Sequence, residues 1–206
     1  MAVQVKAFPV GPLQVNCCMV WDDSSGSGVV IDPGGEADAV LEALAETGMT
    51  LRAVLLTHGH VDHIGAVGAV CRRVGVPAYL HAADRDLYHS RDNAIPPWIP
   101  AVVDLPEAVS ELPDLAGLDL QVLPTPGHTQ GCVCFHCPTA ALLFSGDTLF
   151  RRSVGRTDLP GGSTADLRRS IRTVLYALPA ATRVFPGHGE TTEIGEEIAG
   201  NPYVRP

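Results

Sequence analysis

The sequence predicts a mixed α/β fold, and three observations carry that prediction. Short apolar runs of strand length alternate with amphipathic stretches of helical period. A length of 206 residues suffices for one sizeable domain, and 46% hydrophobic residues can form a substantial core. The chain has no sequence-level repeat, no low-complexity region and no evident linker. We therefore expect residues 1–206 to form a single domain.

The first part of the chain predicts the start of a sheet and then a helix. Strand-like runs, separated by Gly, Pro, Asp and Ser, cover Val3 to Phe8, Gln14 to Trp21 and Gly28 to Ile31. Ala37 to Thr47 has its apolar residues on one face and ends at Gly48, as an amphipathic helix with a glycine stop does. A further strand is predicted from Ala53 to Leu56.

The rest of the chain continues the alternation. Apolar residues at helical intervals predict a helix just after residue 60; they are Ile64, Val67, Val70, Cys71 and Val74. A short strand, a helix and a proline-rich stretch follow at Ala78 to Leu80, Ala82 to His89 and Ile95 to Pro113. Later strands are predicted at Leu120 to Leu123, Gly131 to His136, Ala141 to Phe144 and Arg183 to Phe185. A last helix starts at a Ser163 or Thr164 cap and buries Leu167, Ile171, Val174, Leu175 and Leu178.

The segment Thr-His-Gly-His-Val-Asp-His, residues 57–63, concentrates three imidazoles and a carboxylate. His58 and His60 are two residues apart in an extended or turning segment, so both can face one ion. Asp62 and His63 follow at the start of a helix and would face a second ion. Imidazole with carboxylate suits zinc, iron or manganese, whereas calcium and magnesium prefer oxygen ligands. The bland alternative is a polar loop with hydrogen-bonded histidines.

Further donors follow three apolar runs, each at a turn. They lie in Thr125-Pro126-Gly127-His128-Thr129, Ser145-Gly146-Asp147-Thr148 and Pro186-Gly187-His188-Gly189. Functional groups gather at strand ends in α/β architectures, and Gly and Pro permit the tight turns that aim them. Taken singly, His128 or His188 is also explained as a capping or surface histidine, so the case rests on the set.

With these motifs the chain resembles the metallo-β-lactamase-fold superfamily over nearly its whole length, and within it the short glyoxalase II-like hydrolases. The resemblance implies a four-layer αβ/βα sandwich, with two mixed sheets flanked by helices. It assigns one metal to His58, His60 and His128, a second to Asp62, His63 and His188, and a bridging position to Asp147. We expect the protein to lack the helical C-terminal domain of the longer glyoxalase II enzymes, which leaves the substrate open.

The resemblance also implies a reaction. Two divalent transition metal ions, zinc first and iron or manganese as alternatives, would hold a bridging hydroxide that attacks a thioester. S-(2-hydroxyacyl)glutathione is the expected substrate class. Metal coordination lowers the pKa of water from ~16 toward ~7, which explains a nucleophile at neutral pH. Asp62 and Asp147 would position that nucleophile as the catalytic carboxylates.

Neighbouring polar residues receive supporting roles. Asp32 or Thr57 would orient a ligand histidine through its other ring nitrogen, although Asp32 at a turn before Pro33 is equally explained as a turn cap. Arg156, in a cationic segment of an acidic chain, corresponds in glyoxalase II-like enzymes to a residue that helps hold the glutathione moiety. An intramolecular pair between Arg156 and Asp158 is the alternative.

Composition limits the partners and the location. A formal net charge of −9 disfavours a nucleic-acid-binding surface but not a small anionic substrate. No apolar stretch approaches the ~20 residues that cross a bilayer, and the N-terminal residues lack a signal-peptide pattern, so we expect a cytoplasmic protein that binds no membrane. Six cysteines then stay reduced, although Cys132, Cys134 and Cys137 could also bind a soft metal.

Two other functions remain open from sequence. The related persulfide dioxygenases share the scaffold and the Gly-Arg-Thr-Asp segment, and would hold a single iron on His58, His128 and Asp147. A non-catalytic metal- or partner-binding domain would be expected to lose ligands, and here all seven positions are filled. Nuclease and β-lactamase activities are weaker expectations. The sequence does not determine the oligomeric state.

Overall fold

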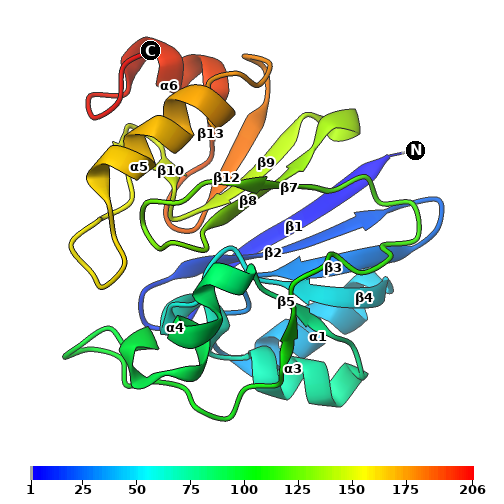
Figure 1. Ribbon diagram of the computed structural model, residues 1–206. Helices are drawn as coiled ribbons and strands as arrows, with labels where there is room; N and C mark the ends of the chain where they lie inside the picture. The colour runs from blue at the N-terminus through cyan, green and yellow to red at the C-terminus, as the bar shows by residue number, and fades with distance from the viewer. Residues whose placement is uncertain (1) are drawn as a thin grey trace. The chain divides into compact units, whose positions relative to one another are not determined.

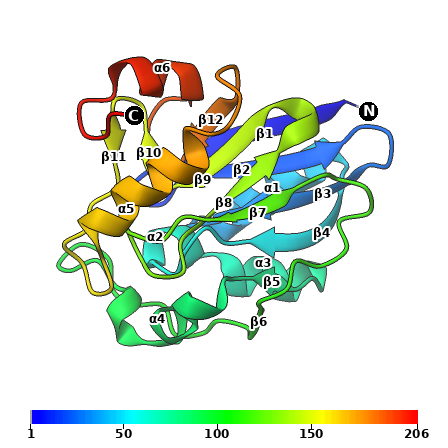
Figure 2. The ribbon, with the colours of Figure 1, turned by 45° about the horizontal axis from the view of Figure 1, so that its top comes forward.

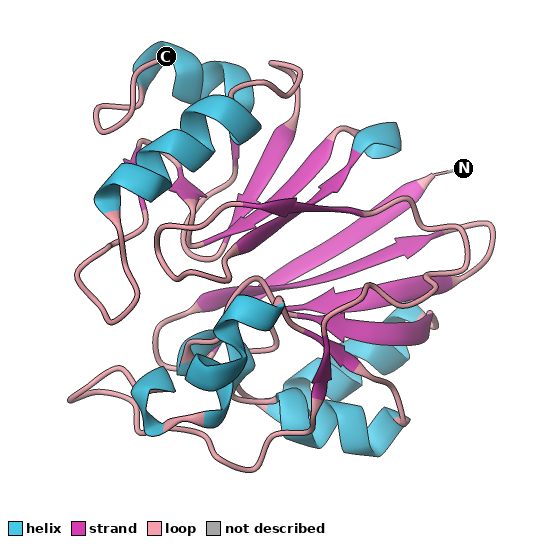
Figure 3. Cartoon of the chain, viewed as in Figure 1, coloured by secondary structure: helices cyan, strands magenta, loops and turns pink. Residues whose placement is uncertain are grey.

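The computed structural model describes residues 2–206, which divide into two compact units (Figure 1). The first unit ends at Asp119, and the second runs from Leu120 to Pro206. Each unit has its own mixed sheet with helices beside it, as Figure 3 shows by colour. The predicted mixed α/β fold with two mixed sheets and flanking helices is therefore confirmed. A single domain over residues 1–206 stays a prediction.

The sheet of the first unit has the strand order β1-β2-β3-β4-β5-β6. Its strands are β1 (Val3–Val10), β2 (Val15–Asp22), β3 (Ser27–Ile31), β4 (Thr50–Leu55), β5 (Ala78–Tyr79) and β6 (Ala108–Val109). The first three strands pair antiparallel, and the pairs from β3 to β6 are parallel. This change of direction follows from the connections, because a helix links β3 to β4 whereas tight turns link β1 to β2 and β2 to β3.

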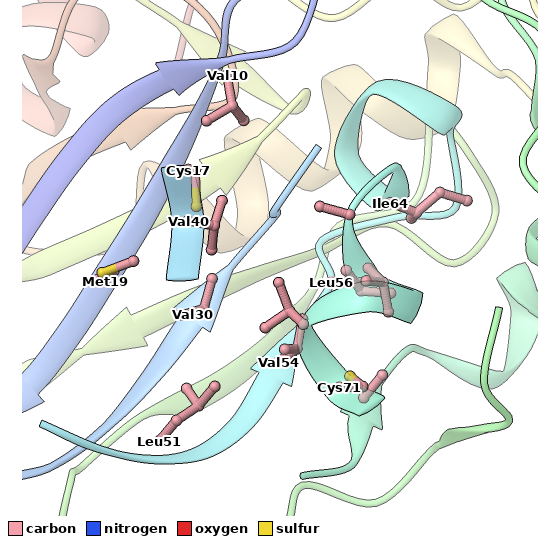
Figure 4. Packing of buried hydrophobic residues seen from close by; sticks show 14 of the residues in the cluster. Val10, Cys17, Met19, Val30, Val40, Leu51, Val54, Leu56, Ile64 and Cys71 are labelled. Carbon is pink, nitrogen blue, oxygen red and sulfur yellow. The ribbon is translucent and has the colours of Figure 1, made fainter. Parts of the chain in front are cut away.

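Helices cover one face of this sheet and bury the core of the first unit. They are α1 (Ala37–Thr47), α2 (Val61–Ile64), α3 (Val67–Val74) and α4 (Arg85–His89), with the 3-10 turns η1 (Ala82–Asp84) and η2 (Arg91–Asn93). Figures 1 and 2 place α1 and α3 side by side against the sheet. Val30 of β3, Val40 of α1, Val54 of β4 and Cys71 of α3 belong to the buried cluster that Figure 4 shows. Burial of such apolar side chains is the main stabilising term for the unit.

The sheet of the second unit has the order β13-β12-β9-β8-β7. Its strands are β7 (Gln121–Pro124), β8 (Val133–Cys137), β9 (Leu142–Gly146), β12 (Arg183–Pro186) and β13 (Thr192–Glu193), and β10 (Leu149–Phe150) pairs with β11 (Ser153–Val154). β9 is parallel to β12 and antiparallel to β8, which is antiparallel to β7. Strands β7, β9 and β12 therefore run in the same direction, and their carboxyl ends meet at one edge of the sheet.

The helical elements of this unit complete its core. They are the turn η3 (Pro138–Ala140), α5 (Thr164–Ser170), the π-helical turn η4 (Ile171–Leu175) and α6 (Ile194–Gly200). The Ser163 side chain accepts a hydrogen bond from Asp166 N, 3.3 Å away, so the predicted cap of α5 is confirmed. Leu167, Ile171 and Leu175 form a buried cluster with Leu143 and Val184 of the sheet.

The structure corrects several predicted boundaries. One continuous helix behind the histidine motif was wrong, because α2 and α3 are separate segments and Val74 at the end of α3 is 38% exposed. β4 begins three residues before Ala53, since its first residues alternate between exposed and buried and lack a continuous apolar run. The last predicted helix leaves α-helical geometry after Ser170. The short elements α6, β6, β10, β11 and β13 were not predicted at all.

Candidate metal-binding residues and their supports

In the first unit, the loop after β4 and the start of α2 gather four donor side chains. His58, His60, Asp62 and His63 are each at most 6% exposed. The His58 ring centroid lies 4.9 Å from that of His60 and 4.1 Å from that of His63. Asp62 Oδ2 lies 3.7 Å from His63 Nε2. Burying so many polar rings together is unfavourable unless they are hydrogen-bonded or hold an ion.

Asp32, at the end of β3, holds this loop in place. Its Oδ1 accepts a hydrogen bond from Thr57 N at 2.8 Å, and its Oδ2 accepts from Thr57 Oγ1 at 2.7 Å and from His63 Nδ1 at 2.9 Å. Asp32 is 2% exposed and has a φ of 50°, a left-handed conformation that is unfavourable for a residue with a Cβ. The surrounding contacts maintain that conformation, as is common at functional sites.

These hydrogen bonds determine which nitrogen of two imidazoles carries the proton. A carboxylate only accepts, so the Nδ1 of His63 donates to Asp32 and its Nε2 carries the lone pair. Thr57 Oγ1 already donates its hydrogen to Asp32, so it accepts from the Nδ1 of His58, 3.1 Å away. His58 therefore also presents a lone pair on Nε2. In this tautomer an imidazole can bind a metal ion through Nε2, and support at the other nitrogen is typical of metal sites.

In the second unit, His128, Asp147 and His188 follow the parallel strands β7, β9 and β12, one donor after each strand. Asp147 Oδ2 lies 3.7 Å from His128 Nε2, and Asp147 Oδ1 lies 3.6 Å from His188 Nε2. These separations are too long for hydrogen bonds. They resemble the separation of about 3.4 Å between neighbouring donors on a tetrahedral ion with bonds of ~2.1 Å. Asp147 is thus oriented as a carboxylate that can serve two ions.

His128 is fixed in the same tautomer by the backbone. Its Nδ1 lies 2.7 Å from the carbonyl oxygen of Arg156, which can only accept, so Nε2 again carries the lone pair. The sequence predicts a substrate-binding role for the Arg156 side chain. It does not predict the role of the Arg156 carbonyl group, because every residue type has one. The imidazole and carboxylate donors in each unit, with the tautomers of His58, His63 and His128 set this way, fit divalent transition metal ions.

Two glycines lie close to the backbone carbonyl groups of Asp62 and Asp147. A Cβ on Gly34 would lie 1.5 Å from the carbonyl oxygen of Asp62, and a Cβ on Gly155 would lie 1.8 Å from that of Asp147. Neither position can carry a side chain without displacing the backbone of a donor residue. A glycine preference at these sites was not predicted, because the contacts join segments distant in sequence.

The side chain of Arg156 is paired with Asp158. Its Nε and a terminal nitrogen donate to the two Asp158 oxygens at 2.7 and 2.8 Å, and this interaction lowers the pKa of Asp158 to about 2. The pairing is the alternative that the sequence left open beside substrate binding. Arg156 also borders a cavity of about 300 Å³, together with Thr157, Arg168 and Tyr203.

The C-terminal segment supports the hairpin that follows Asp147. Glu197 of α6 is fully buried, and its carboxylate accepts hydrogen bonds from Arg152 N at 3.0 Å, Thr192 Oγ1 at 2.7 Å and Asn201 Nδ2 at 2.8 Å. Asn201 Nδ2 also donates to Ser153 O at 3.1 Å. Residues 194–204 are thereby tied to β11 and to the turn before it.

The cysteines are distributed through both cores. All six are free thiols and buried. Cys132 Sγ accepts hydrogen bonds from the Thr129 N and Oγ1 atoms at 3.3 and 3.1 Å, beside His128. Cys134 contacts Thr125, and Cys137 contacts Thr139, at 3.3 and 3.5 Å between sulfur and hydroxyl oxygen. Within residues 2–206, no helix is both long enough and apolar enough to span a bilayer.

Comparison with known proteins identifies the family to which this fold belongs. Residues 10–188 match the metallo-β-lactamase superfamily. The chain is 34% identical to a protein of Haemophilus influenzae named hydroxyacylglutathione hydrolase GloC, over 98% of each chain.

Solved structures agree with the sequence comparison. The crystal structure of BLEG-1, a B3 metallo-β-lactamase, has a TM-score of 0.88 at 36% identity and covers 98% of this chain and 99% of that one. The structure of TTHA1623 in a di-iron-bound form has a TM-score of 0.80 at 41% identity, over 95% and 98%. ETHE1 from Myxococcus xanthus has a TM-score of 0.77 at 29% identity, over 97% and 83%. The predicted fold family is confirmed by these likenesses.

Proposed function

The chain belongs to the metallo-β-lactamase superfamily, and on that basis we propose that it is a metal-dependent thioester hydrolase. The carrying observation is that hydrogen bonds at Nδ1 of the buried His58, His63 and His128 put the lone pair of each ring on Nε2, as metal binding through Nε2 requires. S-(2-hydroxyacyl)glutathione is the proposed substrate class. The likeness to GloC, a hydroxyacylglutathione hydrolase by name, supports this choice over other small substrates.

We propose that the donors of the two units together bind two ions within one domain of residues 1–206. His58, His60 and His128 would hold the first ion, Asp62, His63 and His188 the second, and Asp147 would bridge them. The orientation of the two Asp147 oxygens toward different histidines supports the bridging role. Zinc is the proposed metal, with iron or manganese as alternatives, and the di-iron form of TTHA1623 supports iron among these.

When bound, the ions would lower the pKa of a water molecule toward ~7 and polarise the thioester carbonyl. The residues of the chain prepare that step. Asp62 and Asp147 would accept hydrogen bonds from the attacking water and so orient it toward the carbonyl carbon. Asp32 and Thr57 keep the proton on Nδ1 of His63 and His58. Water adds to the acyl carbon, the C–S bond breaks, and the products are a carboxylic acid and a thiol.

Arg156 is the proposed contact for a substrate carboxylate. A guanidinium fork suits a carboxylate, and the adjoining cavity, lined also by Arg168, would admit an anionic group. Binding requires Arg156 to exchange its partner Asp158 for the substrate. Because that pair is about half exposed, the exchange costs little free energy.

The test is hydrolysis of S-lactoylglutathione by protein reconstituted separately with zinc, manganese or iron. A His58→Ala variant serves as the control. Turnover by the metal-loaded protein that disappears in the variant would support the thioesterase. A protein that binds metal but releases no thiol with any of the three metals would count against it.

β-Lactam hydrolysis is a second candidate, favoured by the likeness to BLEG-1. The same metal-loaded samples should be assayed with a chromogenic cephalosporin. Faster turnover of the β-lactam than of the thioester by the same samples would reverse our assignment.

The one-iron dioxygenase expected as an alternative from sequence is tested by oxygen consumption with glutathione persulfide under iron loading.

We also propose that the protein works in the cytoplasm. Six buried free thiols suit a reducing compartment. Fractionation of cells that produce the protein would test this location directly.

A further inference from the structure

A second buried carboxylate, Asp84, contacts the loop that carries the first two histidines. Asp84 is 1% exposed, and its Oδ2 accepts a hydrogen bond from Gly59 N at 3.0 Å. Gly59 is the residue between His58 and His60. The contact was not predicted, because Asp84 lies 25 residues further along the chain and in no recognisable motif.

The position of Asp84 in its own segment argues against a local role. It precedes α4 as the N-terminal capping residue, where an Asp side chain usually accepts a hydrogen bond from the first turn of the helix. Here its side chain makes no such capping bond. The carboxylate is instead directed to the histidine loop.

The segment that carries Asp84 also packs closely on Gly59. A Cβ at Gly59 would lie 3.3 Å from Tyr88 N and 3.4 Å from both Asp84 O and Leu87 Cγ. The loop between the two histidines is therefore held by η1 and α4 on one side, while Asp32 holds Thr57 just before it. Neighbouring backbone amides are thus held by two buried carboxylates from different parts of the first unit.

We propose that Asp84 is a positioning residue for the ion held by His58 and His60. It acts through the Gly59 amide, which fixes the directions of the two imidazoles on either side, and its negative charge favours a nearby cation. This inference rests on the proposed metal site. Residues that orient metal ligands from outside typically change metal affinity by 10–100-fold when they are replaced.

The experiment measures metal binding rather than turnover. Apo-protein is titrated with zinc against a chromophoric chelator, and the cobalt(II) form is examined by visible absorption, which reports ligand geometry. We expect Asp84→Ala to bind one ion per chain tightly in place of two. The affinity for the ion held by His58 and His60 should be weaker by at least about tenfold. Asp84→Asn keeps an oxygen that can accept from Gly59 N, so it should recover most of the loss.

Asp22→Ala is the matched control. Asp22 is a buried carboxylate of the same unit that accepts hydrogen bonds from the Ser24 and Ser25 amides at 3.0 and 2.8 Å. Its replacement should lower stability and leave zinc affinity and the cobalt spectrum unchanged. If Asp84→Ala binds metal as the wild type does, or if Asp84→Asn loses as much affinity as Asp84→Ala, the inference is wrong. Wild-type protein that binds no metal would refute the proposed function as well.

Discussion

Asp147 illustrates how one side chain can serve two positions. Its two oxygens lie 3.7 and 3.6 Å from the Nε2 atoms of His128 and His188. In the proposed site, the two ions would share the negative charge of this carboxylate. Asp147→Asn keeps the size and removes the charge. We expect this variant to retain one ion per chain in place of two and to lose at least about a hundredfold in thioester turnover.

Metal content after dialysis, measured together with turnover, tests the role of Asp147. Asp166→Asn is the control, since Asp166 pairs with the exposed Arg169, three residues further along the same helix. Two tightly bound ions in the Asp147→Asn protein would contradict the bridging assignment.

The tautomers of His58, His63 and His128 show what can be learned only from structure. The sequence identifies these residues as donors through spacing and through the strand ends that present them. It also suggests Asp32 and Thr57 as supports. It does not reveal that the Arg156 carbonyl holds His128, nor that Asp84 holds Gly59, because backbone contacts carry no residue signature.

At the level of elements, the turn between β9 and the β10–β11 hairpin depends on a backbone contact. Gly155 lies against the Asp147 carbonyl, where a Cβ would be 1.8 Å away. Gly155→Ala must shift one of the two segments, so we expect a loss of about 2 kcal/mol or more in the free energy of unfolding and weakened metal binding. Urea unfolding and zinc titration measure the two effects.

Gly48→Ala separates backbone strain from damage to the donors. Gly48 ends α1 with a φ of 66°, and a Cβ at this position would meet nothing within 4 Å. This substitution should destabilise the protein by about 1 kcal/mol and leave zinc affinity as it is. Equal metal affinity in the Gly155→Ala and Gly48→Ala proteins would be inconsistent with our account.

Helix α6 acts as a buried tie for the neighbouring hairpin. Glu197 accepts hydrogen bonds from three donors in different segments. Glu197→Ala removes the acceptor of the Arg152 amide and of one Asn201 side-chain hydrogen, whereas Thr192 Oγ1 keeps Glu196 Oε2 as an acceptor at 3.0 Å. We expect a loss of about 3 kcal/mol in the free energy of unfolding. Glu196→Ala, at an exposed position one residue earlier, leaves the three Glu197 contacts in place, including the 2.7 Å bond from Thr192 Oγ1, and should change the free energy of unfolding by less than about 0.5 kcal/mol. Similar urea midpoints for the two variants would show that the hydrogen bonds of Glu197 contribute little to the free energy of unfolding.

The prediction of elements succeeded where a strand or helix has its own periodic pattern. β1, β2, β3 and α1 fall within two residues of their predicted bounds. The strands of two residues, such as β6 and β13, failed because pairing with a neighbour defines them, and that partner is distant in sequence. The prediction missed the break between α2 and α3 for a similar reason. Gly65 packs against the carbonyl group of Gly34, which is distant in sequence, and a Cβ at Gly65 would lie 2.3 Å from that oxygen.

For the whole molecule, buried cysteine thiols make the free energy of unfolding fall as the pH rises into the alkaline range. Burial raises the pKa of Cys17 and Cys18 in β2, and raises that of Cys71 in α3 to about 11. Above the unperturbed value of 9.0, these thiols ionise in the unfolded chain while they stay protonated in the folded one. Stability is thus complete below pH 9 and falls as the pH rises, by up to about 1.4 kcal/mol per pH unit for each such thiol.

Urea unfolding at pH 8, 9 and 10 measures this dependence. Cys71→Ala should reduce the slope between pH 9 and 10, because the variant has one fewer thiol that titrates differently in the two states. A slope that is the same in both proteins would exclude Cys71 as a contributor.

The parallel directions of β7, β9 and β12 have a consequence for how such a protein can change in evolution. Each strand delivers one donor and then enters a loop of its own, so the length of a loop can change while the donor before it stays anchored in the sheet. Inherited insertions in these loops would alter which molecules reach the donors without rebuilding the core. One chemical centre could in this way be adapted to a new substrate by the gain or loss of a few surface residues.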